Sequence, residues 1–142
     1  MKFRRARKTD QAKIYSMINE LEDFSLNRKN FAKIFTLNLK DKNVHYIVAT
    51  DKNQIVGFIS LHIQNLLHHA GKVAEIQELF VDPATRGKGI GEKLVDYVRV
   101  IAKRQGCNSF ETTSNMKRER THKFYEQKAS MSRTHYKFTQ IL

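Results

Sequence analysis

The chain has 142 residues, and 26 Lys plus Arg against 14 Asp plus Glu give it a formal net charge of +12 at pH 7. This length suits one domain spanning residues 1–142, and a hydrophobic share of 40% is too high for a disordered polycation. No run reaches the roughly 18 apolar residues of a membrane-spanning helix, and no apolar run follows the basic start, so we expect a cytoplasmic protein without a membrane partner.

The first third of the chain predicts a strand and two helices. Residues 2–6 suit a short strand, after which Thr9 or Asp10 offers a side-chain oxygen to cap a helix. Apolar residues then recur at i, i+3, i+4 and i+7, which is one buried helical stripe: Ile14, Met17, Ile18 and Leu21. Asn30 is the expected cap of a shorter second helix.

The middle of the chain predicts three strands. Residues 44–50 and 55–63 are rich in β-branched and aromatic side chains and flank a polar turn, which is typical of an antiparallel hairpin. Residues 73–81 form a further strand that ends at Asp82 and Pro83, because Pro cannot donate to the ladder.

The last third alternates helices with strands. An amphipathic helix begins near Ile90 and stops at Gly106, and residues 109–113, 117–128 and 135–141 suit a strand, a helix and a closing strand. The order β-α-α-β-β-β-α-β-α-β predicts a single-domain α/β fold, with a mixed, mostly antiparallel sheet and helices on both faces.

A basic, Gly-rich turn at residues 82–91 lies between a predicted strand and a predicted helix. Its glycines allow close backbone approach and positive φ, while the first N–H groups of the helix carry partial positive charge. Arg86 and Lys88 add full charges, so the turn predicts a pyrophosphate site. The spacing fits neither a P-loop nor a Rossmann turn, and a solvated turn is the plain alternative.

The pattern Arg86-x-x-Gly89-x-Gly91 resembles the acyl-CoA-binding motif of the GNAT superfamily of N-acetyltransferases, and the predicted element order agrees with that fold. The resemblance implies acetyl-CoA as cosubstrate. It also implies that the backbone of Phe80 and Val81 pairs with the pantetheine arm. It further implies that the CoA pyrophosphate is bound by the residues of the turn: Arg86, Gly87, Lys88, Gly89, Ile90 and Gly91.

A later segment agrees with this resemblance. Asn115 and Tyr125 match the family's Asn that faces the cofactor and its Tyr beside the thioester sulfur. The family usually places a Gly a few residues after the Tyr, and Ala129 stands there in this chain.

Acetyl transfer needs a neutral amine and a proton for the leaving thiolate. Glu78 is the candidate base, acting through water, and Tyr125 the candidate acid, because a Tyr with an ordinary pKa near ~10 is protonated at pH 7. A backbone N–H near Phe80 is a candidate to polarise the thioester carbonyl. The alternatives are a solvated strand Glu and a Tyr that only packs; Cys107 suits a structural thiol.

Several stretches carry a closer resemblance: Leu61-His62-x-Gln64, Glu75-Ile76-Gln77-Glu78-Leu79 and His122-x-Phe124-Tyr125. They resemble aminoalkylphosphonate N-acetyltransferases, and the likeness covers most of the chain after the second predicted helix. It implies a small phosphonate-bearing amine as acceptor and brings a divalent metal into question, with His68 and His69 as predicted ligands beside Glu78. Lys117 and Arg118 are candidates to hold the phosphonate. An unliganded His pair in a surface loop is the alternative.

Two other readings compete with this one. The charge, together with the basic and aromatic residues of 133–138, would suit a nucleic-acid-binding module, although no known nucleic-acid motif is present and we do not expect that partner. The second alternative is an acetyltransferase of the same fold whose acceptor is a protein or peptide N-terminus. A homodimer is compatible with the superfamily. Five basic residues among the first eight are not explained by any of these functions.

Overall fold

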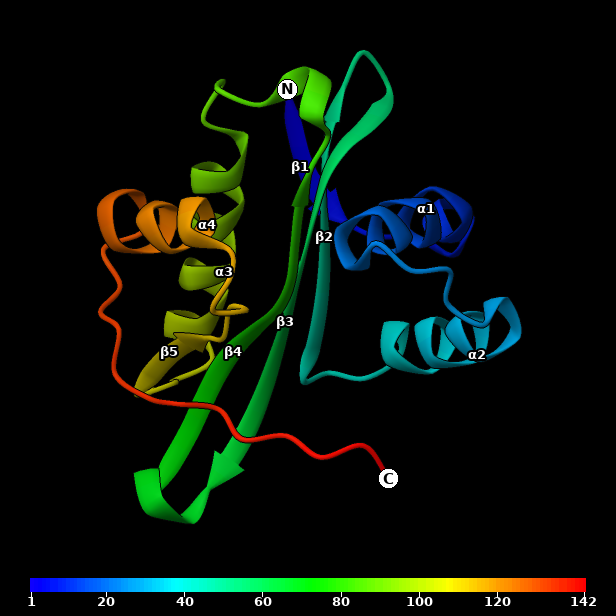
Figure 1. The fold of residues 1–142 in the computed structure, drawn as a ribbon. Coiled ribbons are helices and arrows are strands. Elements are labelled where there is room, and N and C mark those ends of the chain that lie inside the picture. The colour runs from blue at the N-terminus through cyan, green and yellow to red at the C-terminus, as the bar shows by residue number, and fades with distance from the viewer.

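A computed structural model describes residues 1–142 and shows one five-stranded sheet in the order β1-β2-β3-β4-β5 (Figure 1). The strands are β1 (Lys2–Arg5), β2 (Val44–Asp51), β3 (Gln54–Leu66), β4 (Gly71–Val81) and β5 (Ser109–Thr112). The first four pair antiparallel in sequence order, and β5 joins β4 in parallel. A parallel partner needs a crossover, which the segment containing the third helix supplies.

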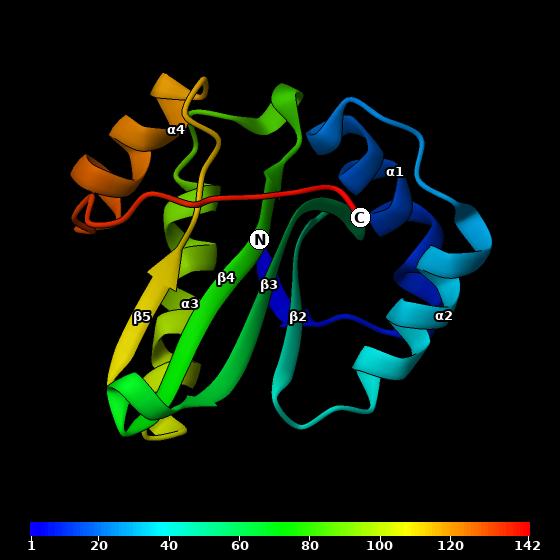
Figure 2. The same cartoon turned by 60° about the horizontal axis from the view of Figure 1, so that its bottom comes forward.

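Four α-helices cover the two faces of this sheet: α1 (Gln11–Glu22), α2 (Arg28–Leu39), α3 (Ile90–Arg104) and α4 (Glu119–Lys123). Figures 1 and 2 show α1 and α2 on one face, with α3 and α4 on the other. The predicted mixed α/β architecture is therefore confirmed.

Each face of the sheet has its own core because successive strand residues point to opposite sides. On β2, Ile47 and Ala49 belong to a cluster of 14 buried residues that packs under α3, whereas Val48 belongs to a cluster of nine under α1 and α2. Leu94, which is fully buried on α3, contributes roughly 1.5–3 kcal/mol through burial alone.

The helix starts differ in detail from the prediction. Helix α2 begins at Asn27, whose side-chain oxygen accepts a hydrogen bond from the Asn30 N–H at 2.9 Å, so the predicted cap lies three residues too late. Asp10 precedes α1, but its carboxylate accepts from the Arg7 N–H at 2.7 Å and pairs with Arg4. Arg4, one of the five unexplained basic residues, therefore has a structural partner.

The predicted closing strand at residues 135–141 is wrong. Residues 132–142 have no regular structure, and every one of them is exposed; they leave α4 as an extended arm (Figures 1 and 2). The predicted helix 117–128 also breaks up, because α4 passes into a π-helical turn at Phe124–Lys128. Alternating polarity specifies a strand only where a neighbouring strand supplies hydrogen-bond partners, and this arm has none.

Candidate active site

A β-bulge in β4 lies at the centre of the candidate site. Ile59 of β3 pairs with Leu79 and Leu61 pairs with Ile76, so Gln77 and Glu78 both lie opposite Ser60. Regular alternation would place Glu75 and Glu78 on opposite faces of the sheet. With the extra residue, both carboxylates lie on the face that α1 and α2 cover.

Glu78 is held in this position by Ser60. The Glu78 N–H donates to Ser60 Oγ at 3.0 Å, and the Ser60 hydroxyl donates to the Glu78 carboxylate. Tyr46 from β2 faces the same space, and its hydroxyl accepts a hydrogen bond from Asn38 Nδ2 at 2.7 Å. Burial raises the pKa of Tyr46, and the nearby Glu78 charge raises it further.

A cavity of about 180 Å³ adjoins Glu78 between the sheet and the two helices α1 and α2. Glu78 is its single charged lining residue; the remaining lining residues are hydrophobic: Ile14, Ile18, Leu26, Phe31, Ile34, Phe35, Tyr46 and Phe58. Ile34 is exposed at the rim, so the cavity communicates with the surface. A carboxylate at the edge of an apolar cavity suits the binding and deprotonation of an amine.

The opposite edge of β4 has free backbone groups. The ladder with β5 ends at Ile76 and Thr112, whereas β4 continues to Val81 (Figure 1). Asp82 N–H donates to Val56 O at 2.9 Å, and alternation of the antiparallel ladder then directs Phe80 toward β3 and Val81 toward the open edge. Arg86 Nε indeed donates to Val81 O at 3.1 Å on that side.

This register bears on Phe80, for which a backbone contact with the pantetheine arm is predicted. The backbone of Phe80 faces β3 and its side chain is buried under α1 and α2, so Leu79 is the residue that shares the open edge with Val81. An extended pantetheine arm can pair with such an edge as an added strand would.

The Gly-rich turn opens directly from this edge into α3. Gly87 and Gly89 have φ of +81° and +72°, and a Cβ at either would meet no atom within 4 Å. These glycines are therefore needed for their backbone conformation and for space left to a ligand. Gly91 has a different role, because a Cβ there would lie 3.3 Å from the Phe124 ring.

The turn is a suitable anion site. Gly89 is the N-cap of α3, so the first N–H groups of a 15-residue helix point out of this turn with Arg86 and Lys88 nearby in the chain. The predicted pyrophosphate residues thus lie together, with Ile90 buried beneath them as an anchor.

Tyr125 belongs to the π-helical turn Phe124–Lys128 and packs against the core on the α3 side of the sheet. Burial raises the pKa of its hydroxyl, an effect larger than the lowering by the Thr112 hydrogen bond and by the Arg118 charge. Tyr125 is therefore protonated at neutral pH, as the role of an acid requires. Its backbone O accepts from the Met131 N–H at 3.0 Å, which fixes the turn.

Asn115 lies at the end of β5 but uses its side chain locally. Its Oδ1 accepts from the Lys117 N–H at 2.9 Å, and its backbone O contacts His122 Nε2 at 2.8 Å. The neighbouring Ser114 has a buried hydroxyl with no hydrogen-bond partner. A buried polar atom without a partner is costly, so Ser114 is a candidate ligand contact that the sequence did not reveal.

Arg118 has one partner in α1 and acts on Tyr125. Its guanidinium donates to Leu21 O at the end of α1, at 2.8 Å, and its charge lowers the pKa of Tyr125. Arg118 is thus a cation close to both α1 and Tyr125. Lys117 beside it is exposed.

The structure does not bring the predicted metal ligands together. His68 and His69 lie in the turn between β3 and β4, with their rings 4.5 Å apart, and His69 Nε2 lies 3.5 Å from Glu111 Oε1. Glu78 is seven residues further along β4 than Gly71, roughly 23 Å of strand. No group of three or more His, Cys, Asp or Glu could hold a metal, so these residues do not fit one.

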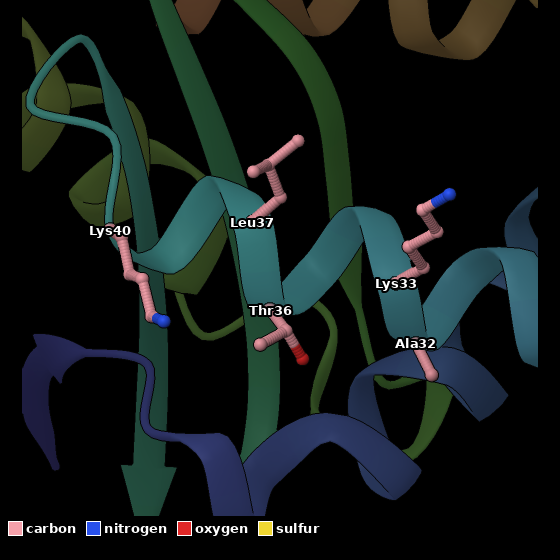
Figure 3. Close-up of a pocket in the computed structure, with 5 residues that line it drawn as sticks. All are labelled: Ala32, Lys33, Thr36, Leu37 and Lys40. Carbon is pink, nitrogen blue, oxygen red and sulfur yellow. The ribbon is translucent and has the colours of Figure 1, made fainter.

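Two further features lie outside this site. A hollow of about 460 Å³ is formed by α2 and its C-cap alone, and Figure 3 shows its side chains pointing to different sides of the helix: Ala32, Lys33, Thr36, Leu37 and Lys40.

Burial raises the pKa of the half-buried Cys107, which makes it a poor nucleophile. None of the helices has the length and apolar character needed to span a membrane.

With this geometry in view, the chain belongs to the acetyltransferase (GNAT) family, whose family model matches residues 11–130. The family transfers acetyl groups from acetyl-CoA, which is the ligand that the Gly-rich turn and the open edge of β4 suit.

The chain is similar to a named acetyltransferase and to several solved structures. An aminoalkylphosphonate N-acetyltransferase of Salmonella typhimurium is 39% identical over 139 residues, 98% of this chain and 90% of that protein. A Bacillus halodurans structure described as a transcriptional regulator superposes with a TM-score of 0.91 at 26% identity, covering 99% of both chains. An aminoglycoside 6'-N-acetyltransferase of Acinetobacter haemolyticus gives a TM-score of 0.84 at 16% identity, covering 100% of this chain and 99% of that one, which shows the shared fold.

Proposed function

We propose that this protein transfers the acetyl group of acetyl-CoA to the primary amine of a small aminoalkylphosphonate, by direct attack within a ternary complex. The observation that carries the proposal is the position of β4 between two unlike surfaces. Its open backbone edge leads to the anion-binding turn, while Glu78 on its side-chain face borders an apolar cavity. The Salmonella relative supports the acceptor class.

In this proposal the α3 side binds the cosubstrate. The amides around Gly87 and Gly89, with Arg86 and Lys88, hold the pyrophosphate. The edge groups of Leu79 and Val81 pair with the pantetheine arm, which places the thioester in the opening between β4 and Tyr125. An unpaired N–H on this edge is positioned to polarise the thioester carbonyl.

The chemistry follows from the groups on either side of that opening. Glu78 accepts a proton from the acceptor ammonium, through water, and leaves a neutral amine. The amine nitrogen bonds to the carbonyl carbon, and the carbon–sulfur bond then breaks with its electron pair leaving on sulfur. Tyr125 donates its proton to that thiolate, while the nitrogen, now bonded to the acetyl carbon, loses its remaining extra proton to water. The products are the neutral amide and the CoA thiol, Glu78 releases its proton to solvent, and Tyr125 recovers one from solvent.

The phosphonate needs a cation near the acceptor amine. Arg118 supplies one, because it lies close to both α1 and Tyr125, and Lys117 adds a second charge at the surface. No step is assigned to a metal, since the His pair lies at the far end of the β3–β4 hairpin from Glu78.

A turnover assay with acetyl-CoA tests this proposal. The purified chain is offered 2-aminoethylphosphonate, 1-aminoalkylphosphonates, polyamines, aminoglycosides and peptide N-termini, each with and without a chelator, and CoA thiol release is measured. We expect kcat/KM to be highest for an aminoalkylphosphonate and unchanged by chelator. Preference for peptides or aminoglycosides would overturn the acceptor, and no release with any amine would overturn the activity.

A further inference from the structure

Ser60 occupies a position that its neighbours do not explain. It is fully buried at the middle of β3, on the face where Phe58, Phe80 and Tyr46 form an apolar layer under α1 and α2. A buried hydroxyl among apolar side chains costs free energy unless it is hydrogen-bonded. Here both of its bonds go to one residue, Glu78.

These two bonds act on different parts of Glu78. The Glu78 N–H, which the bulge removes from the regular ladder, finds Ser60 Oγ at 3.0 Å. The Ser60 hydroxyl proton is then directed at the Glu78 carboxylate. One side chain thus satisfies the backbone of the bulge and orients the carboxylate that the bulge presents.

We infer that Ser60 is a positioning residue for the proposed base: it holds the Glu78 carboxylate at the rim of the cavity and fixes the direction in which its oxygens point. The inference rests on the proposed function, because it takes Glu78 as the group that receives the amine proton. A base must lie within hydrogen-bond reach of the proton it removes, directly or through one water, so its orientation decides its rate.

Other groups facing Glu78 do not duplicate this role. The residues that α1 and α2 contribute to the cavity are all apolar. From the sheet, neither Tyr46 of β2 nor His62 of β3 makes a hydrogen bond to Glu78: the Tyr46 hydroxyl contacts Asn38, and His62 lies opposite Glu75 in the ladder. Glu75 adds a like charge on the same face. Ser60 is therefore the side chain whose removal leaves the Glu78 backbone N–H without a partner.

The first test does not depend on the acceptor. Amide hydrogen exchange of Glu78 is followed by NMR in the wild type, Ser60→Ala and Ser60→Thr. We expect Ser60→Ala to speed exchange of this amide by about 10-fold, the loss of one hydrogen bond, and Ser60→Thr to retain protection because it keeps a hydroxyl. Unchanged exchange in Ser60→Ala would overturn the inference even if every amine in the turnover assay failed.

The second test separates positioning from folding. With 2-aminoethylphosphonate at saturating acetyl-CoA, Ser60→Ala should lower kcat about 10–100-fold with acetyl-CoA affinity unchanged, and Ser60→Thr should restore most of the rate. Adding Ser60→Ala to Glu78→Gln should change the rate little, since the carboxylate is already gone. Thr50→Ala, which removes another hydroxyl from the sheet, is the matched control.

Three outcomes would overturn the inference. One is an unchanged kcat in Ser60→Ala; another is the same rate loss from Ser60→Ala with and without Glu78→Gln; the third is full activity in Glu78→Gln. If Ser60→Ala fails to fold, Ser60→Cys keeps the volume with a weaker donor, and an intermediate rate is then expected.

Discussion

The two sides of β4 offer different kinds of groups to a ligand. On the α3 side, the proposed binding groups are backbone: the open strand edge at Leu79 and Val81 and the amides of the Gly-rich turn. On the α1 and α2 side, the proposed groups are side chains, with Glu78 and Tyr46 beside an apolar cavity. A shared cosubstrate can be recognised through backbone geometry that many sequences adopt, whereas an acceptor must be recognised through side chains.

The largest effect is expected from a substitution in the Gly-rich turn, which should weaken acetyl-CoA binding alone. Gly89→Asp puts a side chain at φ +72° and a negative charge in the anion site, so acetyl-CoA affinity should fall at least about 100-fold, or about 2.7 kcal/mol. Isothermal calorimetry measures it. Gly106→Asp is the control, because Gly106 has a similar φ of +76° with equal space but lies beyond the other end of α3. Equal affinity in both variants would contradict the placement.

A smaller effect tests the proposed acid, Tyr125. Tyr125→Phe removes the proposed acid and should lower kcat about 10–100-fold while acetyl-CoA affinity stays near the wild-type value. Because burial raises the pKa of Tyr125, the hydroxyl stays protonated through neutral pH and the rate should not fall there for lack of the acid. Steady-state kinetics with Tyr136→Phe, a change in the exposed arm, provides the comparison. A wild-type kcat would assign Tyr125 to packing.

The ion pair between Arg4 and Asp10, which lies just before α1, can be tested through the free energy of unfolding. Asp10→Asn removes the partner of Arg4, whose nitrogens lie 2.7 and 3.1 Å from the carboxylate, and should cost about 1–3 kcal/mol of unfolding free energy. Arg4 lowers the pKa of Asp10, so this contribution is present above its ordinary value of 3.8 and is lost as pH falls below it. Urea unfolding with the exposed Asp23→Asn as control measures it, and equal midpoints would refute the pairing.

The smallest effect is on the pH dependence of stability, and it concerns His45 on the face of β2 that α3 covers. His45 shares its face with Ile47, and its Nε2 has no hydrogen-bond partner. Burial, and then the Arg5 charge, lowers the pKa of His45, so the folded protein keeps it neutral and stability should fall as pH drops below about 6.5. The slope for one group is at most about 1.4 kcal/mol per pH unit. His45→Leu should flatten the curve between pH 7 and 5, whereas His135→Leu in the arm should leave it unchanged.

Backbone features were the predictable part of the site. Gly89 and Gly91 follow a strand and open a helix, and this local pattern identified the turn, although not the packing of Gly91 against Phe124. Strands and helices were predictable for the same reason, since each depends on periodicity within a few residues.

The side-chain part depends on pairing between distant strands and could not be predicted to the same degree. Ser60 and Tyr46 meet Glu78 only through the register of β2, β3 and β4. One signal was available: Ile76 and Leu79 are three residues apart yet face the same core, so the apolar alternation of this strand shifts by one at Gln77. The closing strand predicted at residues 135–141 was wrong for the opposite reason: its alternation is regular, but no neighbouring strand supplies hydrogen-bond partners.

The two proposed binding surfaces meet at adjacent residues of one strand, Leu79 and Glu78 of β4. Under the proposed function, a cosubstrate paired with the Leu79 backbone and an acceptor beside Glu78 would act on the same short segment. If cosubstrate binding strengthens acceptor binding by some factor, the acceptor must strengthen cosubstrate binding by the same factor. The bulge is the place in the chain where such a coupling would be expected.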